Sequence, residues 1–232
     1  MKLFVFTDIH GNLSALKDLS NTKDFIEADK RIFLGDIIAG YSRPNECIEY
    51  LQKLDCEYVL GNNDSYVCDH IPLEEYQLMS PQKLKQIEYF IDLVKPENKK
   101  WVLSKNKELY LEVSDKKFYF VHYPWDSPDN IIDSPVKKNL EERQKMFSNI
   151  EADYIIFGHE HYQSNCFEDG KKLYYCLGSA GIKNPSPYLV IDIGDDGKVN
   201  IEEKSIPNNL DLEVDLTEIA GYPYNKNKLR KH

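Results

Sequence analysis

Short apolar segments that each end in a polar cluster recur along this 232-residue chain, and they constrain its fold more than any other feature. In the first third, strand-like segments at residues 2–7, 31–34 and 57–60 alternate with helical segments at residues 12–19 and 44–54. Strands separated by helices pair in parallel, because a parallel connection needs a crossover of that length. The first third therefore predicts an α/β unit.

The middle and the last third add further helices and antiparallel strands. Ser80-Pro81 predicts the start of a helix to about Val94, where Pro96 is expected to stop it. Ser134-Pro135 predicts another helix to about Ile150. Strand pairs with short turns are predicted at residues 108–113 with 117–121, 164–167 with 172–176, and 188–193 with 199–204, besides one strand at 154–157. Such a chain predicts two sheets with helices outside.

The bulk composition narrows the class of protein. The length suits one domain, and five cysteines without a CxxC pair favour a reduced compartment over a disulfide framework. No apolar run reaches membrane-spanning length, so we expect a cytoplasmic protein without a membrane partner. The net charge of −10 disfavours general nucleic-acid binding, although bound divalent metals would still allow a phosphate substrate.

Five polar clusters directly follow predicted strands. They are Asp8-Ile9-His10, Gly35-Asp36, Gly61-Asn62-Asn63-Asp64, His122 and Gly158-His159-Glu160-His161. Ligands of α/β sheets gather at the carboxyl ends of the strands, where loops converge. The glycines before Asp36, Asn62 and His159 are expected to let the backbone bend sharply as it leaves each strand.

The chemistry of these clusters points to metal ions. Four histidines, two aspartates and one asparagine offer nitrogen and oxygen atoms, which suit manganese, iron or zinc: Asp8, His10, Asp36, Asn62, His122, His159 and His161. A single cluster of this kind is more often plain turn chemistry, and a single buried histidine is more often hydrogen-bonded in a core. Five such placements together favour a metal site.

The ordered set DxH, GD, GN, H and GHxH resembles the calcineurin-like metallophosphoesterase superfamily, over about residues 1–206. The stretches TDIHGNLSAL and LGDIIAGYSRPNECIEYL are similar to its bacterial branch of diadenosine-tetraphosphatase-like and small phosphodiesterases. The resemblance implies an α/β fold of two stacked mixed β-sheets flanked by helices. Residues 207–232 are expected to form a separate polar tail with a basic end.

The resemblance also implies a cofactor of two divalent metal ions per chain, manganese first and iron or zinc as alternatives. Asp8, His10 and His161 would hold one ion, with Asn62, His122 and His159 holding the other and Asp36 bridging them. A hydroxide held between the metals would attack phosphorus. The implied catalytic residues are Asp36, Asn62, Asn63 and Asp64.

The sequence departs from the family pattern in the third motif, after His122 and after Gly35-Asp36. Asn63 stands where a histidine usually assists the leaving group, which predicts a preference for leaving groups that are stable anions, unless His70 or a metal-bound water supplies a proton. The equal alternative is that Asn63 only holds the turn and starts the next helix. Asp64 lacks its usual histidine partner, and capping of the next helix is its other expected role. Tyr123 replaces a common glycine and is expected at the rim, crowding the substrate entrance. The Asp-Arg-Gly extension of protein phosphatases is missing.

These observations predict a metal-dependent phosphoesterase. The leading hypothesis is hydrolysis of a phosphodiester or phosphoanhydride bond in a small substrate, for which a nucleotide or dinucleotide is an option. The alternatives are a phosphomonoesterase with the same metal site, and an interaction scaffold that has lost the chemistry.

Overall fold

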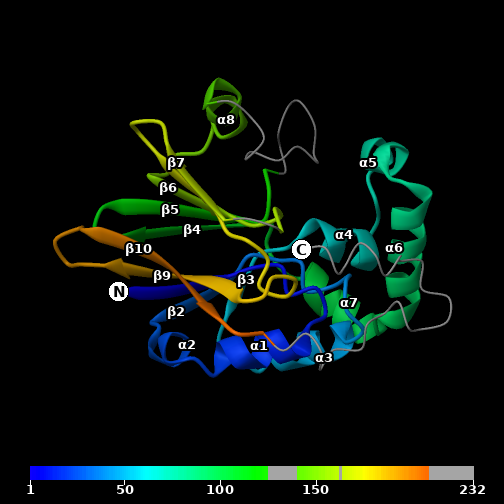
Figure 1. Cartoon of the computed structure of the whole chain (residues 1–232). Coiled ribbons are helices and arrows are strands. Elements are labelled where there is room, and N and C mark those ends of the chain that lie inside the picture. The colour runs from blue at the N-terminus through cyan, green and yellow to red at the C-terminus, as the bar shows by residue number, and fades with distance from the viewer. Residues whose placement is uncertain (125–139, 162–163, 209–232) are drawn as a thin grey trace.

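The computed structural model describes residues 1–124, 140–161 and 164–208, which form two five-stranded β-sheets stacked between helices (Figure 1). In chain order the elements are β1 (Lys2–Phe6), α1 (Leu13–Ser20), α2 (Lys23–Glu27), β2 (Lys30–Phe33), α3 (Pro44–Leu51), β3 (Glu57–Tyr58), α4 (Asn62–Cys68), α5 (Leu73–Leu78), α6 (Pro81–Leu93), α7 (Pro96–Leu103), β4 (Glu108–Val113), β5 (Lys116–Val121), α8 (Leu140–Met146), β6 (Tyr154–Phe157), β7 (Asn165–Glu168), β8 (Leu173–Cys176), β9 (Ser186–Ile193) and β10 (Val199–Ile206).

Both sheets are mixed. The first has the order β10-β9-β1-β2-β3, in which β1, β2 and β3 are parallel and the β9–β10 hairpin joins β1 antiparallel. The second has the order β4-β5-β6-β8-β7, in which β5, β6 and β8 are parallel and the two edge strands are antiparallel. The predicted α/β fold of two stacked mixed sheets with helices outside is therefore confirmed.

Central strands such as β1 and β6 are apolar on both faces, because each sheet is covered on both sides there. Along β1, Leu3 and Val5 face the second sheet and meet residues such as Phe118 and Phe120 of β5 in the core between the sheets. Alternate side chains point to opposite faces of a strand, so Phe4 and Phe6 belong to a separate core beneath the helices.

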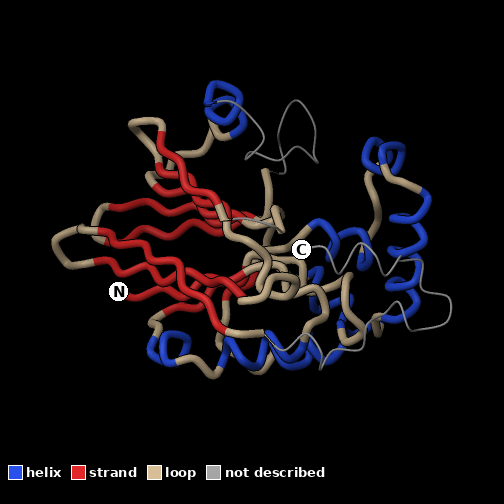
Figure 2. Tube along the Cα trace, viewed as in Figure 1, coloured by secondary structure: helices blue, strands red, loops and turns tan. Residues whose placement is uncertain are grey.

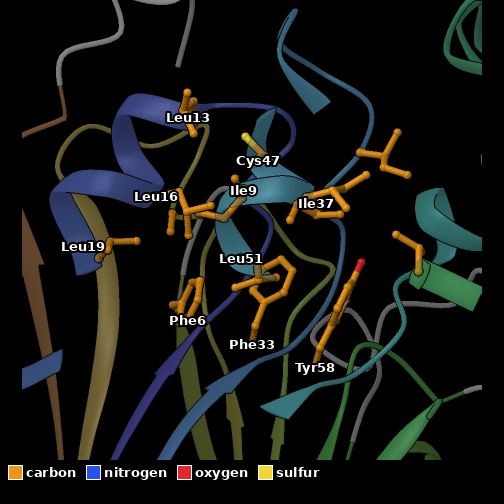
Figure 3. Packing of buried hydrophobic residues seen from close by; sticks show 14 of the residues in the cluster. Phe6, Ile9, Leu13, Leu16, Leu19, Phe33, Ile37, Cys47, Leu51 and Tyr58 are labelled. Carbon is orange, nitrogen blue, oxygen red and sulfur yellow. The ribbon is translucent and has the colours of Figure 1, made fainter. Parts of the chain in front are cut away.

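The helical side of the first sheet is packed by residues at helical spacing. Leu13, Leu16 and Leu19 of α1 lie along one face of that helix and pack with Phe6 and Phe33 of the sheet (Figure 3). The helix begins after Asn12, whose side-chain oxygen accepts a hydrogen bond from the Ala15 N–H at 2.9 Å. This packing fixes the loop between β1 and α1, which carries the first polar cluster.

The helices at one end of the sheets were only partly predicted. Pro96 does follow the end of α6, but it also begins α7 at the first-turn position that suits proline. The sequence indicates α4 only as the helix that Asp64 is expected to cap, and it gives no prediction for the short helices α2, α5 and α7. Helices α4 to α7 lie beside the loops at the strand ends (Figure 2). The helix predicted to about Ile150 is found as α8, and residues 134–139 of that prediction lie outside the described ranges.

Two further expectations concern the cysteines and the ends of the chain. All five cysteines are free thiols. The predicted polar tail lies outside the described residues except for residues 207 and 208. Within the described ranges, every helix is too short or too polar to cross a lipid bilayer.

Candidate metal centre

The loops that follow the parallel strands of both sheets meet at the carboxyl ends of those strands (Figure 2), and the polar clusters lie on these loops. Strand β1 leads to Asp8 and His10, and the neighbouring strands β2 and β3 lead to Asp36 and Asn62. In the second sheet, β5 leads directly to His122, and β6 leads to His159 and His161. The structure thus brings together all seven residues that were predicted to bind metal.

Asp8, His10 and His161 form the first group. Nε2 of His10 lies 3.3 Å from Oδ1 of Asp8 and 3.0 Å from Nε2 of His161, and the latter nitrogen also lies 3.3 Å from Oδ1 of Asp8. Asp36 joins this group, since one ligand atom from each of the four residues falls within 4.8 Å of the others. Three of these side chains are buried and His161 is partly exposed.

Asn62, His122 and His159 form the second group. Oδ1 of Asn62 lies 3.1 Å from Nε2 of His122 and 2.9 Å from Nδ1 of His159. Asp36 also reaches this group, because its Oδ2 lies 3.4 Å from Nε2 of His122 and 3.8 Å from Nε2 of His10. One carboxylate oxygen therefore faces both groups.

The backbone at these residues is strained. Asp8, His10, Asp36 and His159 have φ angles of 54°, 51°, 59° and 71°, in the left-handed region that side chains with a Cβ rarely adopt. Each such residue costs about 1–3 kcal/mol and persists only where the surrounding structure enforces it. Such strain concentrates at functional sites, which favours a functional over a purely structural origin of the cluster.

The glycines before three of the clusters serve two purposes. Gly35, with φ of 93°, provides the bend that was predicted before Asp36. The φ angles of the other two glycines are not positive, so the backbone conformation does not require glycine there. A Cβ on Gly61 would overlap Oδ1 of Asp36, and one on Gly158 would lie 2.8 Å from Oδ2 of Asp8. These two glycines allow close approach of the backbone to the buried carboxylates.

Backbone carbonyls hold two of the histidine rings in one orientation. Nδ1 of His10 lies 2.5 Å from the carbonyl oxygen of Ala39, and Nδ1 of His122 lies 2.7 Å from that of Leu34. A carbonyl oxygen only accepts, so each Nδ1 carries the proton and donates it. In the neutral form of each ring the Nε2 atom then faces the cluster with its lone pair, and this is the form that binds a metal.

The charges of the cluster shift its pKa values strongly. Burial by itself would raise the pKa of Asp36, but the nearby His122 and His10 more than offset it and hold that pKa well below the usual value. Burial would lower the pKa of His122, but Asp36 and Asp8 raise it to about 9. Burial and the charge of His122 lower the pKa of His159 to about 3. A protonated His122 thus balances the two carboxylates, and a metal ion would have to replace that proton.

The donor atoms fit a divalent cation. Oδ1 of Asp8 is buried and has no hydrogen-bond partner among the described residues, although such atoms are nearly always paired. It and the Nε2 atoms of His10 and His161 are 3.0–3.3 Å apart. Ligands about 2.0–2.1 Å from one cation lie about 3 Å from each other. A cation would supply the missing partner of Asp8.

Sequence reasoning missed two residues that hold Asp8. The hydroxyl of Thr7 donates to Oδ2 of Asp8 at 2.6 Å, and the backbone N–H of His159 donates to the same oxygen at 3.1 Å. The hydroxyl of Ser179 donates to the main-chain oxygen of Asp8 at 2.7 Å. Thr7 directly precedes Asp8, so its contact could have been predicted from the sequence. Ser179 is 171 residues from Asp8, and the fold brings the two together.

Asp64 positions the Asp36 loop, and its catalytic role stays a prediction. Its carboxylate accepts backbone N–H bonds from Asp36, Ile37, Ile38 and Gly61 and the hydroxyl bond of Tyr58, at distances of 2.8, 3.0, 3.1, 3.1 and 2.7 Å. Burial, helped by Asp36, raises the pKa of Asp64 to about 6, while the hydrogen bonds from Tyr58 and the Ile38 N–H favour the ionised carboxylate. The bond that the Gly61 N–H donates to Asp64 caps the N-terminus of α4, which is the other role expected for Asp64.

Two other predictions need correction. Tyr123 does not lie at the rim: its side chain is 1% exposed, and its ring stacks on that of His159 with 5.2 Å between centroids. It therefore packs behind a cluster histidine instead of crowding the entrance. His70 is not a proton source for the site, because it is exposed, pairs with Asp69 at 2.7 Å, and does not line the cleft beside the cluster.

That cleft has a volume of about 440 Å³ and opens beside the second group. It is lined by Asn62, Asn63, Tyr66, Leu78, Met79, Ser80, Lys83, His159, Glu160 and His161. Its size suits a small ligand. The site thus combines a largely buried cluster of nitrogen and oxygen donor atoms with an adjoining cleft that is open to solvent.

The sequence profile of the calcineurin-like phosphoesterase superfamily domain matches residues 1–196. The chain belongs to the calcineurin-like phosphoesterase superfamily. An uncharacterized protein of the archaeon Methanocaldococcus jannaschii is 31% identical over 118 residues, which are 51% of this chain and 47% of that protein. The match thus spans about half of the relative's length.

Solved structures of similar fold agree with this family. A hypothetical protein of Pyrococcus horikoshii has a TM-score of 0.71 at 15% identity, with 90% of this chain and 88% of that one covered. A metallophosphoesterase of Sphaerobacter thermophilus has a TM-score of 0.65 at 18% identity, with 91% and 90% covered. At these identities the likeness shows the calcineurin-like phosphoesterase fold.

Proposed function

We propose that this protein is a two-metal phosphoesterase that hydrolyses a phosphodiester or phosphoanhydride bond in a small substrate. The observation that carries the proposal is the convergence of seven residues with nitrogen and oxygen donor atoms, the buried Asp36 among them, beside an open cleft. Membership of the calcineurin-like phosphoesterase superfamily supports the same chemistry.

The proposed ligand sets follow the two groups. Asp8, His10 and His161 would hold one divalent cation, with Asn62, His122 and His159 holding the other and Asp36 contacting both. When bound, the two cations stabilise charge on the phosphoryl oxygens and lower the pKa of a bound water molecule. Manganese is the first candidate, because the carboxylate and amide oxygens suit it, and iron and zinc are alternatives that the imidazole nitrogens suit.

Other residues of the chain hold the side chains of the proposed site in a fixed orientation before substrate binds. Asn63 fixes the Asp36 carboxylate, since its backbone N–H donates to Oδ1 at 2.9 Å and its side-chain amide donates to Oδ2 at 2.5 Å. The carbonyl oxygens of Ala39 and Leu34 orient two histidine rings before any ligand arrives. Groups held in advance need little rearrangement when charge develops on the substrate.

The substrate class follows from the cleft and the charge. A volume of about 440 Å³ suits a small molecule such as a nucleotide or dinucleotide-type phosphoester. The net charge of −10 opposes approach of long polyanions, so we do not propose a general nucleic-acid partner. The metal-free scaffold hypothesis is weaker, because four strained ligand residues bring an interaction module no benefit.

A reconstitution experiment tests the proposal. The chelator-treated full chain should be inactive and should regain hydrolysis when Mn²⁺ is added, on a panel of aryl phosphodiesters, phosphoanhydrides and aryl phosphomonoesters. His122→Ala should abolish the recovery, whereas His70→Ala, which alters an exposed histidine outside the cleft, should leave it unchanged. Recovery only with monoesters would favour the phosphomonoesterase, and no hydrolysis with any metal would refute the proposal.

A further inference from the structure

Lys83 connects the cleft to the centre of the cluster. It lies in the first turn of α6, and its ammonium donates to Oδ1 of Asn63 at 2.6 Å and to Oε1 of Gln86 at 3.4 Å. The amide of Asn63 donates in turn to Oδ2 of Asp36 at 2.5 Å. The side chain of Asn63 thus links the ammonium to the carboxylate that faces both ligand groups. Lys83 also lines the cleft.

The position of Lys83 is electrostatically costly. Burial lowers the pKa of this lysine, and only the charge of Asp36 opposes the shift. The first turn of a helix is its positive end, where a cation is unfavourable. Lys85 lies two residues after Lys83 on the same helix. It is exposed and carries its charge without these costs. The partly buried ammonium of Lys83 at the positive end of α6 therefore favours binding of an anion beside it.

The ammonium can still bind a ligand oxygen. A lysine has three N–H donors, and within the described part of the chain its bonds to Asn63 and Gln86 use two of them. The third can serve an oxygen in the cleft. Glu160 also lines the cleft, but Lys83 is the charged residue that contacts Asn63, at the position where the family pattern has a histidine that assists the leaving group.

Building on the proposed function, we propose that Lys83 binds an oxygen of the leaving group and makes the site selective for phosphoanhydrides, whose leaving group is itself a phosphate. In that reaction water adds to one phosphorus atom, and the bridging P–O bond breaks. The electron pair of the bond stays on the leaving phosphate, and the water gives up a proton to solvent. The charge of Lys83 balances the new negative charge, so Asn63 need not deliver a proton.

Kinetics on two substrates test the selectivity. Lys83→Ala should lower kcat/KM for a phosphoanhydride such as ADP by about 10- to 100-fold, the usual loss of a hydrogen bond to a charged group. The value for bis(p-nitrophenyl) phosphate should fall by less than about threefold, because its aryl oxide leaves without help. Lys83→Arg should restore much of the anhydride rate, and Lys85→Ala should change neither rate.

Binding of a non-hydrolysable analogue gives a readout that does not require turnover. Calorimetry with methylenediphosphonate on the Mn²⁺-treated protein should show affinity at least about tenfold weaker in Lys83→Ala, with little change for orthophosphate. Equal losses for both substrates and both ligands would assign Lys83 a purely structural role through Asn63 and overturn the inference, as would no loss at all. A natural protein that binds the analogue through Lys83 but hydrolyses neither substrate would instead refute the proposed function.

Discussion

Asp36→Asn is expected to lower kcat/KM by at least about 1000-fold, because the contribution of a metal pair to catalysis is several kcal/mol. The variant keeps the size of the side chain but removes the negative charge that both ligand groups face, at 3.4 Å from His122 and 3.8 Å from His10. Both proposed cation sites should weaken together. Steady-state kinetics and metal analysis at rising Mn²⁺ concentration measure the effect.

Two matched variants separate this result from a general loss of structure. Asn62→Ala removes a ligand of one group, so higher Mn²⁺ should restore part of its activity. Asp24→Asn alters an aspartate outside the cluster, whose Oδ2 lies 3.1 Å from Nζ of Lys204. This variant should keep full activity. Near-normal metal content and turnover in Asp36→Asn would show that this carboxylate does not bridge two cations.

Asp64→Ala is expected to destabilise the protein by about 3–5 kcal/mol, one of the largest effects of a single substitution. The change would leave four backbone N–H groups and the Tyr58 hydroxyl without their buried acceptor. The loop that carries Asp36 should then lose its conformation, so metal binding should fail as well. Denaturant unfolding of the metal-free protein measures the loss of stability directly.

Glu46→Ala is the control for this variant. Glu46 is also an acidic residue in the first turn of a helix, but it is exposed and forms a surface ion pair with Arg43, at 3.3 Å. Its loss should cost less than about 1 kcal/mol. If Asp64→Ala cost no more than Glu46→Ala, the network of hydrogen bonds around Asp64 would not be what holds the Asp36 loop.

The cluster could be predicted from the sequence because each of its residues directly follows a strand. His10 and His161 are 151 residues apart and follow parallel strands of different sheets, β1 and β6, and the carboxyl ends of the parallel strands of both stacked sheets lie at the same end of the molecule. The fold could be predicted for the same reason, since apolar segments and turns marked nearly every strand.

What could not be predicted depends on contacts between elements. The role of Asp64 rests on bonds to residues 36 to 38, which only the pairing of β2 with β3 brings close. Lys83 meets Asn63 because α6 packs against α4, and the sequence contains no pattern for that contact. Tyr123 looked like a rim residue because it follows His122, but the second sheet turns it inward against His159.

Metal content is the most direct test of the central claim. The full chain, saturated with Mn²⁺ and freed of loose metal, should contain about two ions per chain by elemental analysis. Hydrolysis should rise in proportion as those two equivalents are added back to the chelator-treated protein. A chain that binds one ion or none at saturating Mn²⁺, or that hydrolyses phosphoesters equally well after complete metal removal, would contradict the two-metal account.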